Sequence, residues 1–330
     1  MPTIHSENFF AKFEEQFRPF VAELGIPESV FSRQDVEIPT TKYAELLELI
    51  ARKANPHIGL DMGERLTFSD MGVVGHAMAA APNIGAMLTM MSQYLYIFSH
   101  SNTMRLDVGR TTVACTYRVT ILQPELIRQD VECALAFITG AIRQASMQPF
   151  SPTRVDFEHT KFAEAHRHLT FFGSEPKFAC NANRLHFSKE VLDYPVMTSD
   201  PGLLEALKFY LDDRIKSRSE DDDLLAKTRH LISASLSQRV PDQNWIASQL
   251  GMSSRTLQRK LGDLEVVFSD LVDEIRQSIA LDYIRHTDYD LTEVALMLGY
   301  GELSSFSRAF KRWTGVSPQS KRNSRHTGVV

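Results

Sequence analysis

The sequence predicts two folded parts of different class, an α+β domain over residues 1–215 and an all-α domain over residues 224–330. Alternating apolar and polar residues, which are typical of strands, occur only in the first part. Between the parts, residues 216–223 (KSRSEDDD) are dense in charge and hold no large apolar residue, as expected of a linker. The length of 330 residues suits two domains of about 100 to 200 residues each.

The composition excludes several classes of protein. With 43% hydrophobic and 23% charged residues, the chain is neither disordered nor fibrous. No stretch approaches the roughly 18 apolar residues of a membrane span, and the first residues are too charged for a secretory signal. We therefore expect a cytoplasmic protein without membrane association.

Cysteine and histidine spacing predicts neither a disulfide framework nor a metal site. Cys115, Cys133 and Cys180 are an odd number at wide spacing, without a paired zinc motif. His166 and His168 lack a metal-binding partner in the sequence, so we expect them on the surface or in a loop. No cofactor is expected.

The first part shows helical spacing of apolar residues in four segments and strand alternation in four others. Phenylalanines recur every three or four residues from Phe9, and the repeat ends before Gly25 and Pro27. The predicted helices are residues 9–24, 41–53, 83–99 and 124–147. The predicted strands are 104–108 and 112–119, a hairpin around Gly109, followed by 153–158 and 184–187.

After the linker, only helical spacing is found. The predicted helices are residues 224–236, 243–250, 254–261, 268–286, 292–298 and 304–313. The charge balance changes as well. Residues 1–223 hold 22 Lys and Arg against 30 Asp and Glu, whereas residues 224–330 hold 14 against 11. A basic second part points to a different partner from the first, such as nucleic acid.

The helical part contains an internal repeat. The segment Ile246-Ala-Ser-Gln-Leu-Gly returns 48 residues later as Val294-Ala-Leu-Met-Leu-Gly. A small residue lets two helices cross closely, and a glycine tolerates the positive φ of the turn between them. Leucine or phenylalanine pairs four residues apart then follow in both copies and seat the next helix on the core. The pattern predicts two helix-turn-helix motifs.

The helix after each turn carries an outward face without acidic residues. The first copy presents Arg255, Thr256, Gln258, Arg259 and Lys260, and the second presents Leu303, Ser304, Ser307, Arg308, Lys311 and Arg312. Arg and Gln make paired hydrogen bonds to guanine and adenine edges, and Lys and Arg neutralise phosphates. These residues therefore predict binding to double-stranded DNA.

The long helix predicted over residues 268–286 would join the two motifs. Nineteen residues make a rod of about 28 Å, close to the roughly 34 Å between successive major-groove faces. One chain could thus place two recognition helices in adjacent grooves, with modest DNA bending taking up the difference.

The most specific part of the helical domain is the stretch from Asp290 to Pro318 (DLTEVALMLGYGELSSFSRAFKRWTGVSP). It matches nearly throughout the signature of AraC/XylS-type transcription regulators, and residues 224–330 resemble the DNA-binding domain of that family. The resemblance implies that Arg255, Gln258 and Arg259 of the first recognition helix read bases. For the second helix it implies Leu303, Ser304, Ser307 and Arg308. Leu303 replaces a residue that is often polar in the family, and a leucine could meet a thymine methyl.

The first part contains the segments Gly59-Leu-Asp-Met-Gly-Glu, Gly72-Val-Val-Gly-His-Ala-Met and Ala81-Pro-Asn-Ile-Gly-Ala-Met-Leu. In these segments it resembles the arabinose-binding-type domain of a subgroup of these regulators. The resemblance implies a homodimer that senses a small molecule, with varied ligands across the subgroup. It also implies an activator with RNA polymerase as a partner.

Three functions are compatible with these features. The first is a transcription regulator whose response to DNA depends on a small molecule. The second is a DNA-architectural protein whose first domain only dimerises. The third is an enzyme with a DNA-binding tail, and it is disfavoured because no GxSxG, P-loop, HExxH or dinucleotide motif is present.

A small-molecule cavity is predicted between the hairpin and the methionine-rich helix 83–99, with a plain apolar core as the open alternative. Strand alternation directs Cys115 and Tyr117 inward, together with Met104 and Leu106 of the neighbouring strand. Tyr94 or Tyr117 would be the polar contact for a ligand, because a buried hydroxyl needs a partner. The predicted effector residues are therefore Tyr94, Met104, Leu106, Cys115 and Tyr117.

Overall fold

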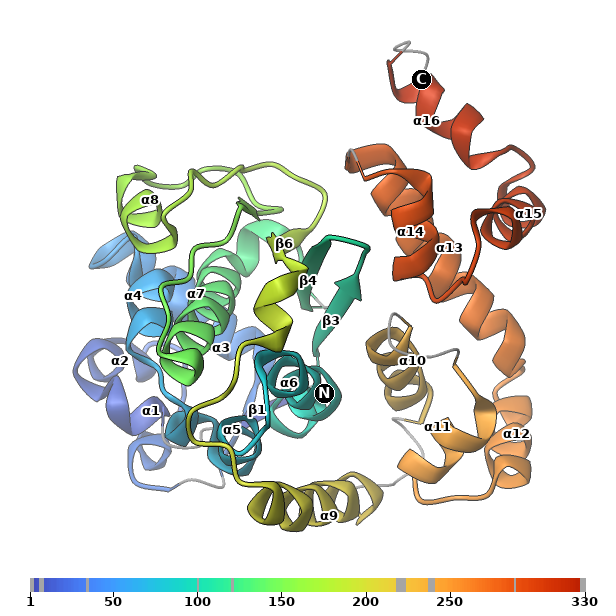
Figure 1. The fold of residues 1–330 in the computed structure, drawn as a ribbon. Coiled ribbons are helices and arrows are strands. Elements are labelled where there is room, and N and C mark those ends of the chain that lie inside the picture. The colour runs from blue at the N-terminus through green and yellow to red at the C-terminus, as the bar shows by residue number, and fades with distance from the viewer. Residues whose placement is uncertain are drawn as a thin grey trace. The chain divides into compact units, whose positions relative to one another are not determined.

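The structure is a computed structural model, and it describes residues 3–326 apart from 6–8, 34–35, 100, 120–121, 218–223, 237–240 and 288. The chain divides into two compact units (Figure 1). The first comprises Met1–Met104 and Ala114–Leu211, and the second comprises Arg105–Val113 and Asp212–Val330. Of the linker predicted over residues 216–223, residues 216 and 217 end a helix and the rest lie outside the described residues.

The first unit is α+β, as the sequence predicts. Its helices are α1 (Phe9–Lys12), α2 (Glu14–Val21), α3 (Thr40–Lys53), α4 (Ile58–Arg65), α5 (Gly72–Ala79), α6 (Ile84–Phe98), α7 (Arg128–Ser146), α8 (His166–Phe172) and α9 (Pro201–Ser217). Short 3-10 helices span Glu28–Phe31, Phe68–Met71, Pro124–Leu126 and Lys189–Asp193.

One two-stranded ribbon and one four-stranded sheet complete the first unit, except that Arg105–Val113 of the predicted hairpin falls in the second unit. Strands β1 (Thr3–His5) and β2 (Glu37–Pro39) form a small ribbon. A four-stranded sheet has the order β3-β4-β6-β5, formed by Asn102–Val108, Thr112–Val119, Asn183–Ser188 and Arg154–Asp156. The predicted hairpin and both later strands are confirmed.

The first predicted helix is interrupted, contrary to the continuous pattern. Phe13 has φ −109° and ψ 23°, so α1 ends and α2 begins around it. The apolar spacing still holds, because Phe9, Phe13 and Phe17 are all buried in one aromatic cluster. The spacing of apolar residues shows which face of a helix is buried, but it does not show where the backbone angles change.

Helix α7 packs closely against α4, and two glycines make this contact possible. A Cβ atom on Gly59 would lie 2.0 Å from the carbonyl oxygen of Gln129, and one on Gly63 would lie 2.3 Å from that of Cys133. Any larger residue at these positions would push the helices apart. The contact fixes α7, which contributes one wall of the cavity described below.

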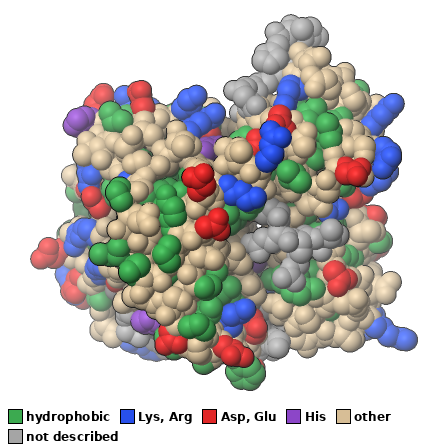
Figure 2. All heavy atoms as spheres, in the orientation of Figure 1, with side chains coloured by type: hydrophobic (Ala, Val, Ile, Leu, Met, Phe, Trp, Pro, Cys, Tyr) green, Lys and Arg blue, Asp and Glu red, His purple; other side chains and the backbone are tan. Residues whose placement is uncertain are grey.

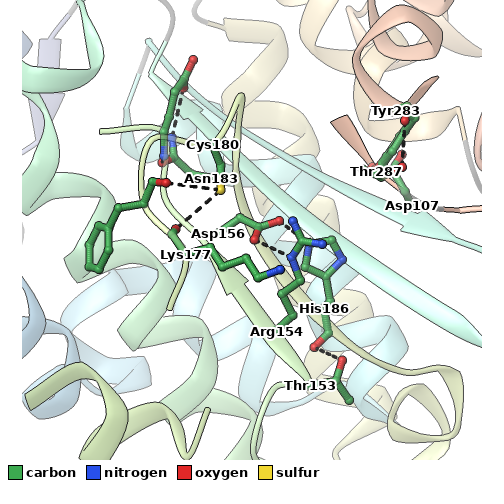
Figure 3. A network of polar contacts seen from close by, with 12 residues as sticks. Asp107, Thr153, Arg154, Asp156, Lys177, Cys180, Asn183, His186, Tyr283 and Thr287 are labelled. Carbon is green, nitrogen blue, oxygen red and sulfur yellow. Dashed lines mark hydrogen bonds and ion pairs between the residues drawn. The ribbon is translucent and has the colours of Figure 1, made fainter. Parts of the chain in front are cut away.

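Several buried polar groups on α7, α8, β5 and β6 lie within ion-pair distance of one another. In Figure 3, Arg154 and His186 both point at Asp156, at 2.6 and 2.9 Å. Burial would raise the pKa of Asp156, but the hydrogen bonds from His186 and Arg154 outweigh it and lower the pKa. The expectation of a surface or loop position is wrong for His168, which is buried in α8, 3.1 Å from Glu132.

The second unit is all-helical from α10 onward in its described part, and this prediction is confirmed. Its helices are α10 (Leu224–Ser235), α11 (Gln243–Gln249), α12 (Ser254–Asp263), α13 (Phe268–His286), α14 (Leu291–Met297), α15 (Leu303–Thr314) and α16 (Pro318–His326). Two apolar clusters lie along α13, one with α11 and α12 and the other with α14 and α15. Ile275 contacts both clusters, so α13 joins the two motifs.

Within the described residues, the helices are all too short or too polar to cross a membrane.

Candidate DNA interface and small-molecule pocket

The two sequence copies adopt the same turn. Gly251 and Gly299 have positive φ angles of 68° and 77°. In the first copy the N–H of Met252 donates to the carbonyl of Ala247 at 2.9 Å, and in the second Tyr300 donates to Ala295, also at 2.9 Å. These six-to-one hydrogen bonds are the C-terminal cap that glycine permits. The internal repeat is therefore a repeat of backbone geometry.

The helix that follows each turn is anchored by large apolar side chains. Leu257 and Leu261 of α12 are fully buried, as are Phe306 and Phe310 of α15. The Ser253 hydroxyl caps α12 by accepting from the Thr256 N–H at 3.1 Å. With the apolar faces seated in this way, the remaining faces of α12 and α15 are left to solvent.

The outward face of α12 combines charge with accessibility. Arg255, Gln258 and Arg259 are exposed, and Thr256 and Lys260 are half-buried. Arg259 pairs with Asp263 one turn later at 3.1 Å, where both side chains are about two-thirds exposed. An exposed pair of this kind contributes little, so Arg259 can exchange its carboxylate partner for a nucleic-acid group.

The outward face of α15 is basic towards its C-terminal end. Ser304, Arg308, Lys311 and Arg312 are exposed, and Ser307 is half-buried. Leu303 is also half-buried and packs against the apolar cluster of α14 and α15. Arg312 lies 2.6 Å from Asp273 of α13, which ties its guanidinium to the scaffold. Figure 2 shows Lys and Arg side chains over α15, with acidic side chains nearby.

The first unit contains a small, mostly apolar cavity of about 50 Å³. Helix α7 contributes Asp130, Cys133, Ala134 and Phe137, a spacing that places all four on one helix face. Helix α6 contributes Met91, Leu95 and Phe98. The remaining lining residues are Ile4, Phe9, Tyr43, Leu66, Met71, Asn102 and Tyr117.

Three polar residues form a connected group on the cavity wall. The Asn102 amide donates to the Tyr117 hydroxyl at 2.5 Å, and Tyr117 donates to Oδ2 of Asp130 at 3.2 Å. Asp130 is only 8% exposed. Burial raises the pKa of this carboxyl to about 7, while the Tyr117 hydrogen bond acts in the opposite direction. Burial also raises the pKa values of Tyr43, Tyr117 and Cys133.

The structure brings only part of the predicted effector set to this cavity. Tyr117 lines it, and so does the methionine-rich helix α6. Tyr94, Met104 and Cys115 are buried but do not contribute to the cavity wall, and Leu106 falls in the second unit. Sequence reasoning missed Asn102 and Asp130. The available signal was a carboxylate among the apolar residues of the predicted helix 124–147.

The described residues include no group of three or more His, Cys, Asp or Glu side chains that could hold a metal ion.

Two family models match the chain. The model described as the arabinose-binding domain of AraC transcription regulator, N-terminal, matches residues 16–196, and a helix-turn-helix domain model matches residues 246–324. The paired turns and these domains define a helix-turn-helix transcription regulator that binds DNA, rather than an enzyme. Because the first model covers more than half of the residues, the chain belongs to the AraC family of transcription regulators.

The chain is also similar to individual proteins of comparable length. An ornithine utilization regulator of Pseudomonas aeruginosa is 26% identical over 81% of this chain and 78% of its own. The HTH-type transcriptional regulator VirS of Mycobacterium tuberculosis is 25% identical over 92% of this chain and 90% of its own. The crystal structure of the transcriptional regulator CdpR from Pseudomonas aeruginosa covers 94% of this chain and 97% of its own, at 21% identity and a TM-score of 0.47.

Proposed function

We propose that this regulator reads its operator with α12 and α15, each in the major groove of one duplex. The observation that carries the proposal is the duplicated turn. In both copies the backbone N–H of the residue after the glycine, Met252 or Tyr300, donates to an alanine carbonyl, and an exposed polar helix follows. Arg255, Gln258 and Arg259 are the base-reading residues of α12, and Ser304, Ser307 and Arg308 those of α15. Thr256, Lys260, Lys311 and Arg312 contact the phosphate backbone.

Leu303 makes a secondary contribution to DNA binding. Its side chain is half-buried and packed on the core, so only part of it faces the groove. A contact with a thymine methyl is compatible with that position, because it requires an apolar edge rather than a hydrogen bond.

We also propose that a small molecule in the cavity of the first unit controls this DNA binding. A regulator responds to a ligand when the ligand binds one of its functional states better than the other. The cavity provides an apolar wall with a polar group inside it, which is the common composition of small-molecule sites. A first domain that served only for dimerisation would have no need of a buried carboxylate on the wall of an internal space.

The active form is proposed to be a homodimer, with α9 in the interface. Leu203 and Tyr210 of α9 are seven residues apart and therefore on one face, and both are about half exposed at 47% and 46%. The adjacent Phe209 is 79% exposed. Large apolar side chains gathered on one helix mark a protein interface, and a second copy of this chain is the proposed occupant.

Activation of transcription, with RNA polymerase as the partner, is carried over from the family resemblance. The test is transcription in vitro from a promoter fragment selected by the purified protein from random duplexes, with RNA polymerase present. The transcript should increase when the regulator is added and change again with its ligand. A decrease would make the protein a repressor, and a response without ligand dependence would favour the architectural alternative.

The dimer is tested separately by sedimentation of the full chain. Phe209→Glu should shift the protein towards the monomer, because the charge would be buried in the interface. Lys208→Gln, exposed on the same helix but pointing away from the face of Leu203 and Tyr210, is the control and should remain dimeric.

A further inference from the structure

Helix α7 carries three charged side chains at alternate positions, and their pairing differs. Arg128 reaches Glu48 of α3 at 2.6 Å. Glu132 lies 3.1 Å from His168 of α8. Asp130, between them, receives only the neutral Tyr117 hydroxyl among the described residues. It is the one of the three that faces the cavity.

A buried carboxylate without a cation is costly, and the position of Asp130 in the first turn of α7, at the positive end of the helix dipole, offsets only part of that cost. A single hydrogen bond from a neutral hydroxyl leaves the second carboxylate oxygen without a donor among the described residues, and most of the side chains that line the cavity are apolar. The raised pKa of Asp130 is the expected consequence of this arrangement. A ligand that supplied a positive charge and an N–H donor would relieve that cost on binding.

The Asn102–Tyr117 pair fixes the direction of this carboxylate. The amide of Asn102 donates to the Tyr117 oxygen, so the Tyr117 proton is directed to Oδ2. Oδ1 is then the acceptor that remains for a donor inside the cavity. Among the described lining residues there is no Lys, Arg or His, so a carboxylate or phosphate on the ligand would find no counter-charge.

We propose that the effector is a small amine, protonated at nitrogen and otherwise apolar, whose ammonium group pairs with Asp130. Its apolar body packs against Met71, Met91, Leu95, Phe98 and Phe137. This inference rests on the proposed ligand-binding function of the cavity and narrows it to one chemical class. It also excludes free amino acids, because their carboxylate would lie in the apolar part of the site.

The test compares matched probes on the full-length protein by isothermal titration calorimetry. Hexylamine and 2-phenylethylamine are the amines, 1-hexanol and 2-phenylethanol the neutral analogues, and hexanoate the anion. The amines should bind at least about tenfold more tightly than the matched alcohols, because the charge-assisted hydrogen bond is made only by the amine. Hexanoate should not bind.

Two variants of α7 locate the source of that preference. Asp130→Asn keeps the size of the side chain and removes its charge, so the ratio of amine to alcohol affinity should fall to about one. Glu132→Gln removes a buried carboxylate two residues away that does not line the cavity, and it should keep the preference. If Asp130→Asn does not fold, the wild-type comparison of amine with alcohol still decides the question.

The outcomes separate this inference from the function on which it rests. Alcohols or hexanoate binding as tightly as the amines would overturn the amine inference and leave the cavity as a ligand site. An amine preference that survives in Asp130→Asn would also overturn it. If none of the probes binds the wild-type protein at millimolar concentration, both the inference and the proposed ligand function of this cavity are wrong.

Discussion

The Tyr117 hydroxyl, 3.2 Å from Oδ2 of Asp130, connects strand β4 to helix α7 across the cavity wall. Tyr117 is itself held by Asn102 of β3, so three elements determine the position of one carboxylate. Neither the strands nor the helix alone would orient this group. The polar end of the cavity therefore depends on the packing of the whole first unit.

Tyr117→Phe should weaken amine binding without abolishing it. The change removes the hydrogen bond that lowers the pKa of Asp130, so the carboxylate becomes harder to ionise. The loss in the free energy of unfolding should be about 1 kcal/mol, as for a neutral buried hydrogen bond. Calorimetric titration with hexylamine and urea denaturation measure the two effects. Unchanged affinity for hexylamine would show that the hydroxyl does not act through Asp130.

The contribution of Asp130 to protein stability should fall between about pH 4 and pH 7. Its pKa is raised from 3.8 to about 7 in the folded protein, so in this range the folded state binds more protons than the unfolded state. Under that condition the free energy of unfolding decreases as pH rises. The groups that share its environment, Tyr43, Tyr117 and Cys133, have pKa values raised from already high values and remain neutral throughout.

Urea denaturation of the wild type and Asp130→Asn at pH 5, 6, 7 and 8 measures this contribution. The stability of the variant relative to the wild type should increase steadily up to pH 7 and then level off. Glu132→Gln is the control. A constant difference between wild type and Asp130→Asn across the series would mean that the carboxyl titrates below pH 5.

The affinity for amines should rise with pH, whereas the contribution of Asp130 to stability falls. The amine is protonated throughout, but Asp130 must lose its proton before it can pair with the ammonium group. Below pH 7 the association constant should therefore rise by about tenfold per pH unit, and above pH 7 it should level off. Calorimetry in buffers of different ionisation enthalpy would also detect the proton released. Affinity independent of pH would contradict pairing with this carboxylate.

The second unit could be predicted from sequence far more completely than the first. Its helices obey a single period, and the two copies of the turn reinforce one another, so the predicted helix 268–286 coincides with α13. The first unit depends on contacts between distant segments. Strand alternation predicts that Cys115 and Met104 face inward, and both are buried. Alternation does not show which inward-facing residues line a cavity and which pack against other side chains, and neither residue lines the cavity.

The partners of buried polar residues were the part that sequence could not provide. Asp130 and Glu132 are two residues apart and equally acidic in the sequence. Only the fold shows that His168 lies beside Glu132 and that Asp130 has no such neighbour among the described residues. The contact of Gly59 with Gln129 is of the same kind, since the residues are 70 positions apart.

Gly299→Ala should destabilise the second helix-turn-helix motif. Gly299 has φ +77°, and a Cβ atom there would lie 2.4 Å from the Leu236 carbonyl oxygen, so strain and steric overlap add. We expect a loss of about 2 kcal/mol or more in the free energy of unfolding, with weaker DNA binding. Gly301→Ala, two residues later with open space around its Cβ, is the matched control and should behave as wild type. Equal stability of both variants in thermal denaturation would mean that the turn is wrongly placed.

Arg259→Ala and Lys311→Ala should weaken DNA binding in different ways. Arg259 lies on the exposed face of α12, where its only recorded ion pair is with a solvent-exposed carboxylate among the described residues. If it reads a base, its loss should cost about 1 to 3 kcal/mol on the specific site and relax selectivity at one position.

Lys311, exposed near the end of α15, should instead contact phosphate. Its loss should weaken specific and random duplexes alike and lower the slope of log affinity against log salt by about one. Fluorescence-anisotropy titrations on both duplexes at four salt concentrations separate the two patterns. Arg312→Ala is a further comparison, because its bond to Asp273 predicts a loss of stability as well as affinity. If Arg259→Ala changed only the salt slope, α12 would lie along the backbone rather than in the groove.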